Sequence, residues 1–91
     1  MQFEWDDAKN AANMAKHGID FRVAIRVFEG PRLRVRSDRA GEPRRKVIGM
    51  IDGLAIAVAY TLRGRARRII SARLASRRER RRFAVAFPDA R

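Results

Sequence analysis

Cysteine is missing from the sequence, and histidine occurs once, at His17. Without cysteine the chain can form no disulfide, no thiolate nucleophile and no cysteine-ligated zinc site. No apolar run approaches the roughly 20 residues that a membrane-spanning helix needs. The N-terminus lacks the charged, apolar and small-residue order of a signal peptide. We therefore expect a cytoplasmic protein.

Short motifs for metals and nucleotides are also missing. One histidine cannot build a histidine-rich metal site, and the aspartates and glutamates show no ligand spacing. The sequence contains no Walker loop and no G-x-G-x-x-G pattern, and the glycine of "RGR" at residues 63–65 indicates a turn. These absences predict a protein that works without a metal or another cofactor.

Acidic residues are greatly outnumbered by basic ones. The 91 residues contain 22 lysines and arginines against 10 aspartates and glutamates, which gives a net charge of +12. Only three of the basic residues are lysines, so 19 are arginines, and ten of these fall within residues 63–82. Arginine binds phosphates through two parallel hydrogen bonds and stacks on bases. The composition therefore predicts a polyanion or an acidic protein as the partner.

Periodicity and turn signals predict an α+β fold in a single domain, residues 1–91. An N-terminal pair of helices is expected, the first capped by Asp6 or Asp7 and closed at Gly18. The second is capped by Asp20 and has an apolar stripe that consists of Phe21, Ala24, Ile25 and Phe28. A C-terminal helix is expected from about residue 77.

Four strands are predicted at residues 32–36, 44–51, 54–61 and 67–73. Their short connections, among them the hairpin signal Asp52-Gly53, indicate an antiparallel meander. Ser76 and Glu79 have the spacing of a capping box at the start of the last helix.

Arg73 is the arginine of most interest. Strict alternation along the last strand separates one face with Arg67, Ile69, Ser71 and Arg73 from another with Arg68, Ile70, Ala72 and Leu74. The second face is the more apolar, so we expect it to pack on the helices and Arg73 to project on the open face. Tyr60 is near the end of the adjacent strand and could stack on a base, although the sequence alone favours an ordinary core or rim position for it.

Two residues could transfer protons. His17 could act as a general acid or base, but a histidine at a helix C-terminus also suits the helix dipole. Glu42 lies in a loop beside Arg44, where it could act as a base or form an ordinary surface ion pair.

Three segments resemble one known family. They read "FEWDDAKNAANMAKHGIDFRVAIRVFEG", "GEPRR" and "DGLAIAVAYTLRGRARRIISARLASRRERRRF", and in this order they are similar to the BrnT ribonuclease toxins of the BrnT–BrnA toxin–antitoxin system. The resemblance implies a RelE-like fold, cleavage of RNA, and neutralisation by a BrnA-like antitoxin with a ribbon-helix-helix domain. It also implies that operator DNA is bound only through the toxin–antitoxin complex.

The family pattern falls on Phe3, Glu4, Trp5, Asp6, Lys16, His17, Gly18, Gly41, Glu42, Arg44, Ser71, Ala72, Arg73, Ala75, Arg78 and Glu79. The chain departs from the pattern at Phe83, where the family often has tyrosine, and at Pro43, which interrupts a stretch that is commonly charged.

Metal-free RNA cleavage can use the 2′-OH of the RNA as the nucleophile. We hypothesise that Arg73, together with Arg44 or Lys16, stabilises the developing charge, and that His17 or Glu42 transfers the proton. Arg67, Tyr60 and Arg78 are the candidate RNA-binding residues. The remaining arginines of the last helix, Arg77, Arg80, Arg81 and Arg82, are about 100° apart and are expected to form a solvated or partner-facing surface.

The alternative is a binding module without catalysis, which docks an acidic protein or a nucleic acid. An inactivated relative of the toxins would have the same sequence features. A transcription factor is less well supported, because the first two helices carry few basic residues and no evident recognition helix.

Overall fold

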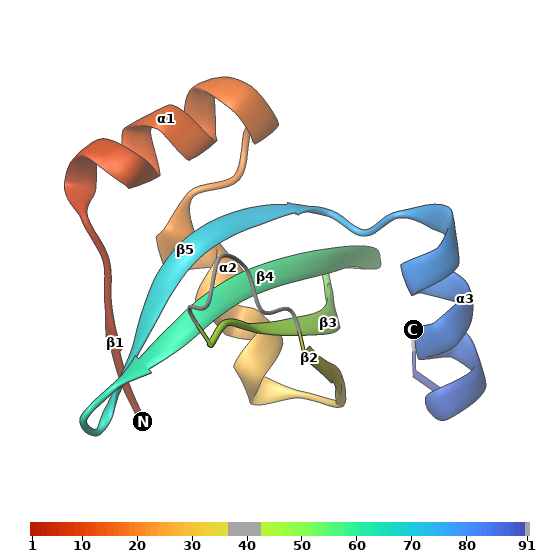
Figure 1. Ribbon diagram of the computed structural model, residues 1–91. Helices are drawn as coiled ribbons and strands as arrows, with labels where there is room; N and C mark the ends of the chain where they lie inside the picture. The colour runs from red at the N-terminus through yellow and green to blue at the C-terminus, as the bar shows by residue number, and fades with distance from the viewer. Residues whose placement is uncertain (37–42, 91) are drawn as a thin grey trace.

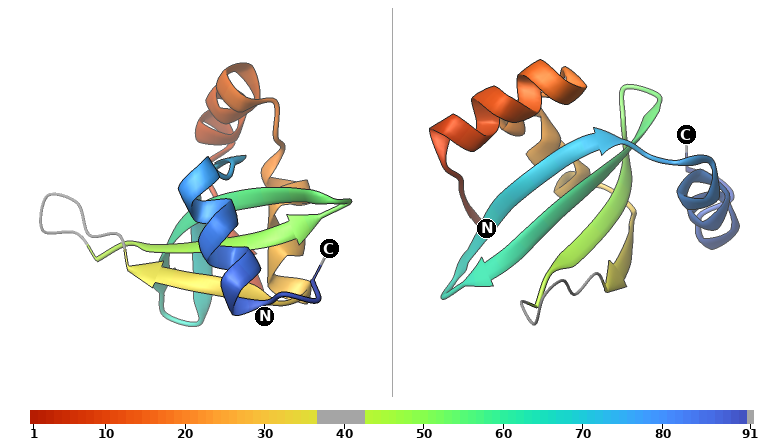
Figure 2. Two further views of the ribbon diagram at one scale, coloured as in Figure 1. Left: turned by 90° about the vertical axis from the view of Figure 1, so that its right-hand side faces the viewer. Right: turned by 45° about the horizontal axis from the view of Figure 1, so that its top comes forward.

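The computed structural model describes residues 1–36 and 43–90 and contains a five-stranded sheet with helices on both faces (Figures 1 and 2). The elements are, in chain order, β1 (Gln2–Glu4), α1 (Asp7–His17), α2 (Phe21–Ala24), the 3-10 helix η1 (Ile25–Glu29), β2 (Arg32–Arg36), β3 (Arg45–Ile51), β4 (Leu54–Arg63), β5 (Ala66–Leu74) and α3 (Arg77–Ala86). The strand order across the sheet is β1-β5-β4-β3-β2. Among the described residues, no helix is long and apolar enough to cross a membrane.

Strands β2 to β5 form the predicted antiparallel meander. The two-residue turn between β3 and β4 has positive φ angles of 49° at Asp52 and 82° at Gly53, as a type I′ hairpin requires. The predicted count of four strands is too low, because β1 adds a fifth strand parallel to β5, with Phe3 opposite Arg67. A strand of three residues is too short for a strand periodicity to show in the sequence.

The first helix begins and ends where the sequence predicts. The Asp6 side chain accepts hydrogen bonds from the amides of Ala8 and Lys9, and Gly18 has the left-handed conformation at φ 72°. The prediction of a second helix over residues 21–28 is only partly correct, because it is a single α-turn that continues as the 3-10 helix η1.

Because η1 has three residues per turn, it buries different side chains than an α-helix of the same sequence would. Val27 is 1% exposed, whereas Ile25, the residue predicted for the stripe, is only half-buried. β-branched residues at Val23, Ile25 and Val27 favour this departure, since they are weak α-helix formers.

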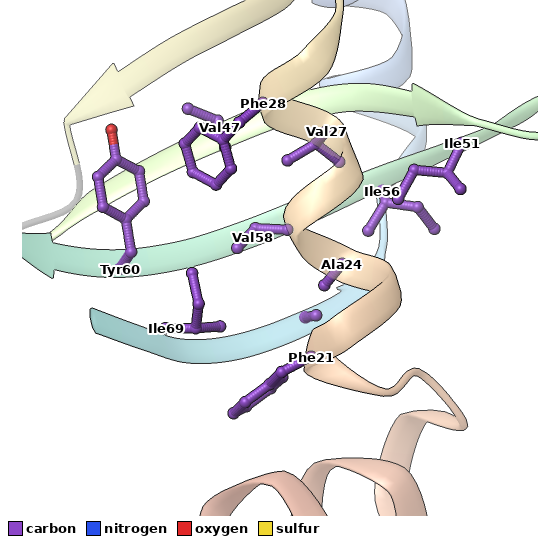
Figure 3. Packing of buried hydrophobic residues seen from close by; sticks show 11 residues of the cluster. Phe21, Ala24, Val27, Phe28, Val47, Ile51, Ile56, Val58, Tyr60 and Ile69 are labelled. Carbon is purple, nitrogen blue, oxygen red and sulfur yellow. The ribbon is translucent and has the colours of Figure 1, made fainter. Parts of the chain in front are cut away.

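Each face of the sheet has its own hydrophobic cluster. We call the face covered by α2 and η1 the core face, and Figure 3 shows its packing around Phe21, Val27, Val58 and Ile69. The opposite face carries Ile48, Ala57, Ala75 and Phe83, and α3 packs there against β2 and β3. We call it the open face, because α3 lies across only one end of it (Figure 2).

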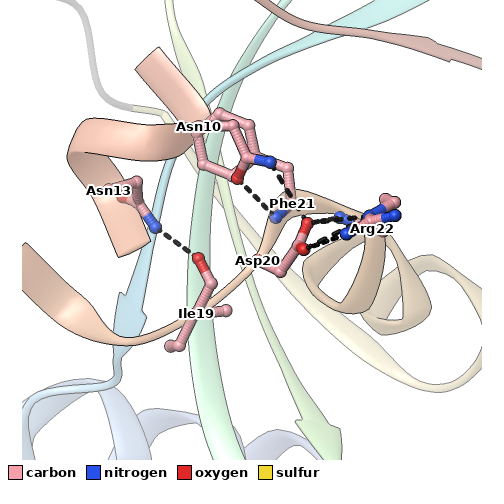
Figure 4. A network of polar contacts seen from close by, with 6 residues as sticks. All are labelled: Asn10, Asn13, Ile19, Asp20, Phe21 and Arg22. Atoms are coloured by element: carbon pink, nitrogen blue, oxygen red, sulfur yellow. Dashed lines mark hydrogen bonds and ion pairs between the residues drawn. The ribbon is translucent and has the colours of Figure 1, made fainter. Parts of the chain in front are cut away.

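Asn13 of α1 closes the outer edge of β5. β1 pairs only with Ala66–Arg68, so the rest of that edge has no strand partner within residues 1–36 and 43–90. The Asn13 amide nitrogen donates to the carbonyl oxygens of Ala72 and Ile19, both at 2.9 Å, and its oxygen accepts from the Ala72 amide at 3.1 Å. Asn10, one turn earlier, accepts from the Phe21 amide (Figure 4). The Asn13 side chain thus makes the two hydrogen bonds to Ala72 that a neighbouring strand would otherwise make.

Replacing Asn13 with alanine should lower the free energy of unfolding by about 2–4 kcal/mol, because it leaves the buried amide and carbonyl of Ala72 without partners. Urea denaturation at neutral pH measures the change. Lys16→Ala, at an exposed position of the same helix, is the control and should shift stability by less than about 0.5 kcal/mol. Equal stability of the two variants would show that Asn13 does not secure this edge.

Candidate functional site

A row of alanines forms the floor of the open face. Along β4 the larger residues Ile56, Val58 and Tyr60 point to the core face, and the alternate positions are Ala55, Ala57 and Ala59. In the register of the sheet, Lys46 on β3 and Ser71 on β5 flank Ala59. Small side chains in the central strand leave room between the longer side chains of its two neighbours.

A β-bulge in β5 determines which arginines reach this floor. Ala59 is opposite Ser71 and Tyr60 is opposite Ile69, so Ile70 has no partner in the register. The strict alternation predicted for this strand is therefore wrong upstream of the bulge, where Ile69 is buried on the core face and Arg68 and Ile70 lie on the open face. Downstream of it, Arg73 lies on the open face as predicted.

The end of the open face that α3 does not cover contains a basic cleft of about 410 Å³. Its lining residues are Lys9, Pro43, Arg44, Arg45, Thr61, Leu62, Arg63, Arg68 and Ile70. Five of the described lining residues are cationic and none is a carboxylate. Glu4 neutralises part of this charge from β1, with an ion pair of 2.7 Å to Arg68.

A second cleft of about 300 Å³ adjoins the first. The two share Pro43, Arg44 and Arg45, and β2 adds Arg34 and Arg36. Positive charge therefore continues from the open face around the start of β3. A ligand with several regularly spaced negative charges matches such a surface better than a single small anion does.

On the same face of the sheet, the Glu79 carboxylate binds two cations. It accepts from Arg73 Nη1 at 2.7 Å and Nη2 at 3.0 Å, and it lies 2.7 Å from Lys46 Nζ. It also accepts from the Ser76 amide at 2.8 Å, which completes the predicted capping box of α3. Arg73 foremost, followed by Lys46 and the Ser76 amide, holds the pKa of Glu79 well below its usual range, although burial acts in the opposite direction. The same hydrogen bonds raise the pKa of Arg73.

The structure brings only some of the predicted catalytic residues together. Arg44 lines the basic cleft, and Arg73 lies on the same face, bound to Glu79. Lys16 and His17 are in the last turn of α1, outside the cleft lining. Glu42 lies outside the described residues.

The three candidate RNA-binding residues occupy different surroundings. Tyr60 is 2% exposed and packs edge-to-face on Phe28, so its ring belongs to the core. The guanidinium of Arg67 lies 5.0 Å from the centre of the same Phe28 ring, on the core face. Arg78 is exposed on α3, as are the arginines at 77, 80, 81 and 82.

Sequence reasoning missed five cations, which are Lys46 beside Glu79 and the cleft-lining Lys9, Arg45, Arg63 and Arg68. Lys9 had a usable signal: seven residues turn a helix through about 700°, so Lys9 and Lys16 lie on the same side of α1, about 10 Å apart. Lys46 also had a usable signal, since it lies on the same side of β3 as the apolar Ile48 and Met50, at every second position. Arg68 was missed because the bulge was not visible in the sequence.

Comparison with known proteins gives a family match and a structural match. A family model described as "Ribonuclease toxin, BrnT, of type II toxin-antitoxin system" matches residues 5–79. Among solved structures, the chain is similar to the crystal structure of the Brucella abortus ribonuclease toxin, BrnT. The two are 31% identical, with a TM-score of 0.63 over 85% of this chain and 99% of that chain. No curated protein matches the sequence significantly.

The Glu79 ion pairs predict a loss of stability in acid. Because folding lowers the pKa of Glu79, the contribution is complete above its usual value of 4.5 and is lost as the pH falls below it. Between about pH 6 and pH 3, the wild type should lose about 1 kcal/mol more unfolding free energy than Glu79→Gln, a figure reduced for the solvent screening at Arg73. Urea denaturation across this range, with the exposed Glu29→Gln as control, measures it. Parallel pH profiles for wild type and Glu79→Gln would contradict the prediction.

Proposed function

The chain belongs to the BrnT family of ribonuclease toxins of type II toxin–antitoxin systems, and on that premise we propose that it cleaves RNA on the open face of its sheet. The observation that carries this proposal is the basic cleft, in which five cations and no carboxylate line the described part of the wall. RNA supplies the matching ligand, a chain of phosphates with bases that arginine can stack on.

The proposed reaction uses the RNA itself as the nucleophile. A base removes the proton of a 2′-OH, the 2′-oxygen attacks the adjacent phosphorus, and the bond to the 5′-oxygen breaks as that oxygen gains a proton. The products are a 2′,3′-cyclic phosphate and a 5′-OH end. Arg73 stabilises the negative charge that develops on the phosphate oxygens, with Arg44 or Lys16 as the second cation.

His17 and Glu42 are the two candidates for proton transfer. His17 is half-buried at the C-terminus of α1, the helix whose Lys9 lines the cleft. Arg67 and Arg78 are proposed to bind RNA outside the reacting phosphate, and Tyr60 would need to leave the core in order to stack on a base.

A toxin of a type II system implies an antitoxin partner. We propose a BrnA-like antitoxin with a ribbon-helix-helix domain, and we propose that operator DNA is bound only by the complex of the two proteins, in the cytoplasm. The exposed arginines of α3 support this part, because they form a charged surface separate from the cleft.

A binding module without catalysis is the second candidate. Two observations favour it: Glu79 already binds Arg73 and Lys46, and Phe83 is buried in the second hydrophobic cluster, at 3% exposure. No phenol stands at that position to take part in proton transfer.

The proposal predicts that the purified chain cuts RNA with EDTA in excess, because the nucleophile belongs to the substrate. A single-stranded RNA oligonucleotide should yield fragments with 2′,3′-cyclic phosphate ends, which mass spectrometry identifies. The same oligonucleotide with 2′-O-methyl groups throughout should stay intact. Cleavage that requires a divalent metal, or cleavage of the methylated oligonucleotide, would exclude this mechanism.

Arg73→Ala should lower kcat by at least about 100-fold, the usual cost of removing one group that stabilises transition-state charge. Arg73→Lys keeps the ion pair with Glu79 but loses the two-pronged contact, so it should recover folding and only part of the activity. Arg80→Ala, at an exposed site on α3, should cut RNA at the wild-type rate. If folded Arg73→Ala also cut at that rate, Arg73 would not be catalytic.

A further inference from the structure

The proposed reaction leaves Lys46 without a role, although this lysine shares a carboxylate with Arg73. We propose that Lys46 and Arg73 form one phosphate-binding unit for RNA, and that Glu79 is the positioning residue that holds the two cations together. This inference rests on the proposed function, since it names the groups that hold the phosphate at that site.

The geometry brings the two cations within reach of one phosphate. Arg73 Nη2 lies 3.0 Å and Lys46 Nζ lies 2.7 Å from the same Glu79 oxygen, Oε2. The two nitrogens are therefore at most 5.7 Å apart, although they come from β5 and β3 with β4 between them. Two cations this close repel each other, and the carboxylate between them offsets that repulsion.

The cluster retains charge and donors for a ligand. One carboxylate balances one of the two cations, so a charge of +1 remains. Among the described residues, Lys46 uses one of its three N–H groups, and Arg73 uses three of its five, two on Glu79 and one on the Leu74 carbonyl. Four donors are left over, enough to bind the oxygens of a phosphodiester.

The position of the cluster supports the same conclusion. Lys46 is beside Ala59 in the register, with Ser71 on the far side of Ala59, and Arg73 is beside Ala57. The floor between the two cations is therefore made of small residues. Arg44, two positions before Lys46, lines the basic cleft, so a chain of phosphates in the cleft continues onto the cluster.

In a purely structural ion pair, we would expect the cations to be as little exposed to solvent as the carboxylate. The Glu79 side chain is 10% exposed, but those of Lys46 and Arg73 are 23% and 38% exposed. The anion is thus enclosed while both cations reach solvent, which is the arrangement that binds a second anion. A clamp that served only to fix α3 would need one cation.

Binding of an uncleavable RNA tests the lysine. A fluorescent single-stranded 2′-O-methyl RNA is titrated with the full chain over a range of salt concentrations. If Lys46 contacts a phosphate, Lys46→Gln should lower the slope of log Kd against log salt by about 0.7, the value for one contact to a single strand. Lys46→Arg keeps the cation and should restore the slope. Arg80→Gln removes the same charge from α3 and should leave the slope near that of the wild type.

Cleavage by Glu79→Gln tests the positioning role. Glutamine at the third helical position can still accept from the Ser76 amide, so the capping box remains. Loss of the negative charge should leave RNA binding as tight as in the wild type or tighter. The two cations are no longer held together, so kcat should fall at least tenfold. A purely structural role for Glu79 would lower the melting temperature and leave kcat unchanged at a temperature where the variant is folded.

The outcomes separate the two proposals. If the wild type cuts RNA and Lys46→Gln matches Arg80→Gln in both slope and kcat, the phosphate-binding unit is refuted and the ribonuclease function stands. If the wild type binds RNA but does not cut it, the ribonuclease function is refuted. The slopes of log Kd against log salt then still show whether Lys46 belongs to a phosphate-binding unit. A wild type that does not bind RNA refutes both.

Discussion

The bulge at Ile70 determines what β5 contributes to each face of the sheet. In a strand of strict alternation, Ile69 and Ala72 would point to opposite faces, yet both are buried on the core face. The extra residue changes the phase, so Arg68 and Arg73, which are five positions apart, both lie on the open face. Without it, one of these arginines would have to be buried in the core. The assembly of cations on one face therefore depends on a single unpaired residue.

Downstream of the bulge, β5 pairs with β4 on one side, and polar side chains hold it on the side where no described strand pairs with it. Asn13 satisfies the backbone of Ala72 at the outer edge, and Glu79 binds Arg73 at the next position. Each of the two is among the least exposed polar residues of the chain, at 7% and 8%. Because buried polar groups bind tightly only in a fixed geometry, these contacts also fix the direction of Arg73. The same buried polar contacts therefore stabilise the fold and orient the proposed site.

A structural feature could be predicted from the sequence when neighbouring residues determine it. Local signals succeeded: the caps at Asp6 and Ser76 and the turn at Asp52 each need only a few neighbouring residues. The fifth strand and the bulge were missed because each is decided by a distant partner, as β1 is by β5. The 3-10 helix was missed because the apolar residues between Phe21 and Phe28 have α-helical spacing, which outweighed the local β-branched residues in the prediction. The family resemblance, confirmed by the comparisons, required only the order of short motifs. It did not reveal that Lys46 shares a carboxylate with Arg73.

The net charge alone overstates how much of the surface is available to bind a polyanion, because some arginines are engaged within the protein. Arg22 and Arg26, which lie outside the cleft lining, each pair with a carboxylate, at 2.8 and 3.0 Å, and Arg32 donates to a backbone carbonyl. Such arginines fix loops and edges and contribute little to binding. The excess that remains is concentrated around the cleft and along α3. Since long-range attraction depends on that excess and specific binding on geometry, α3 can speed the approach of a polyanion, but only the open face can orient it.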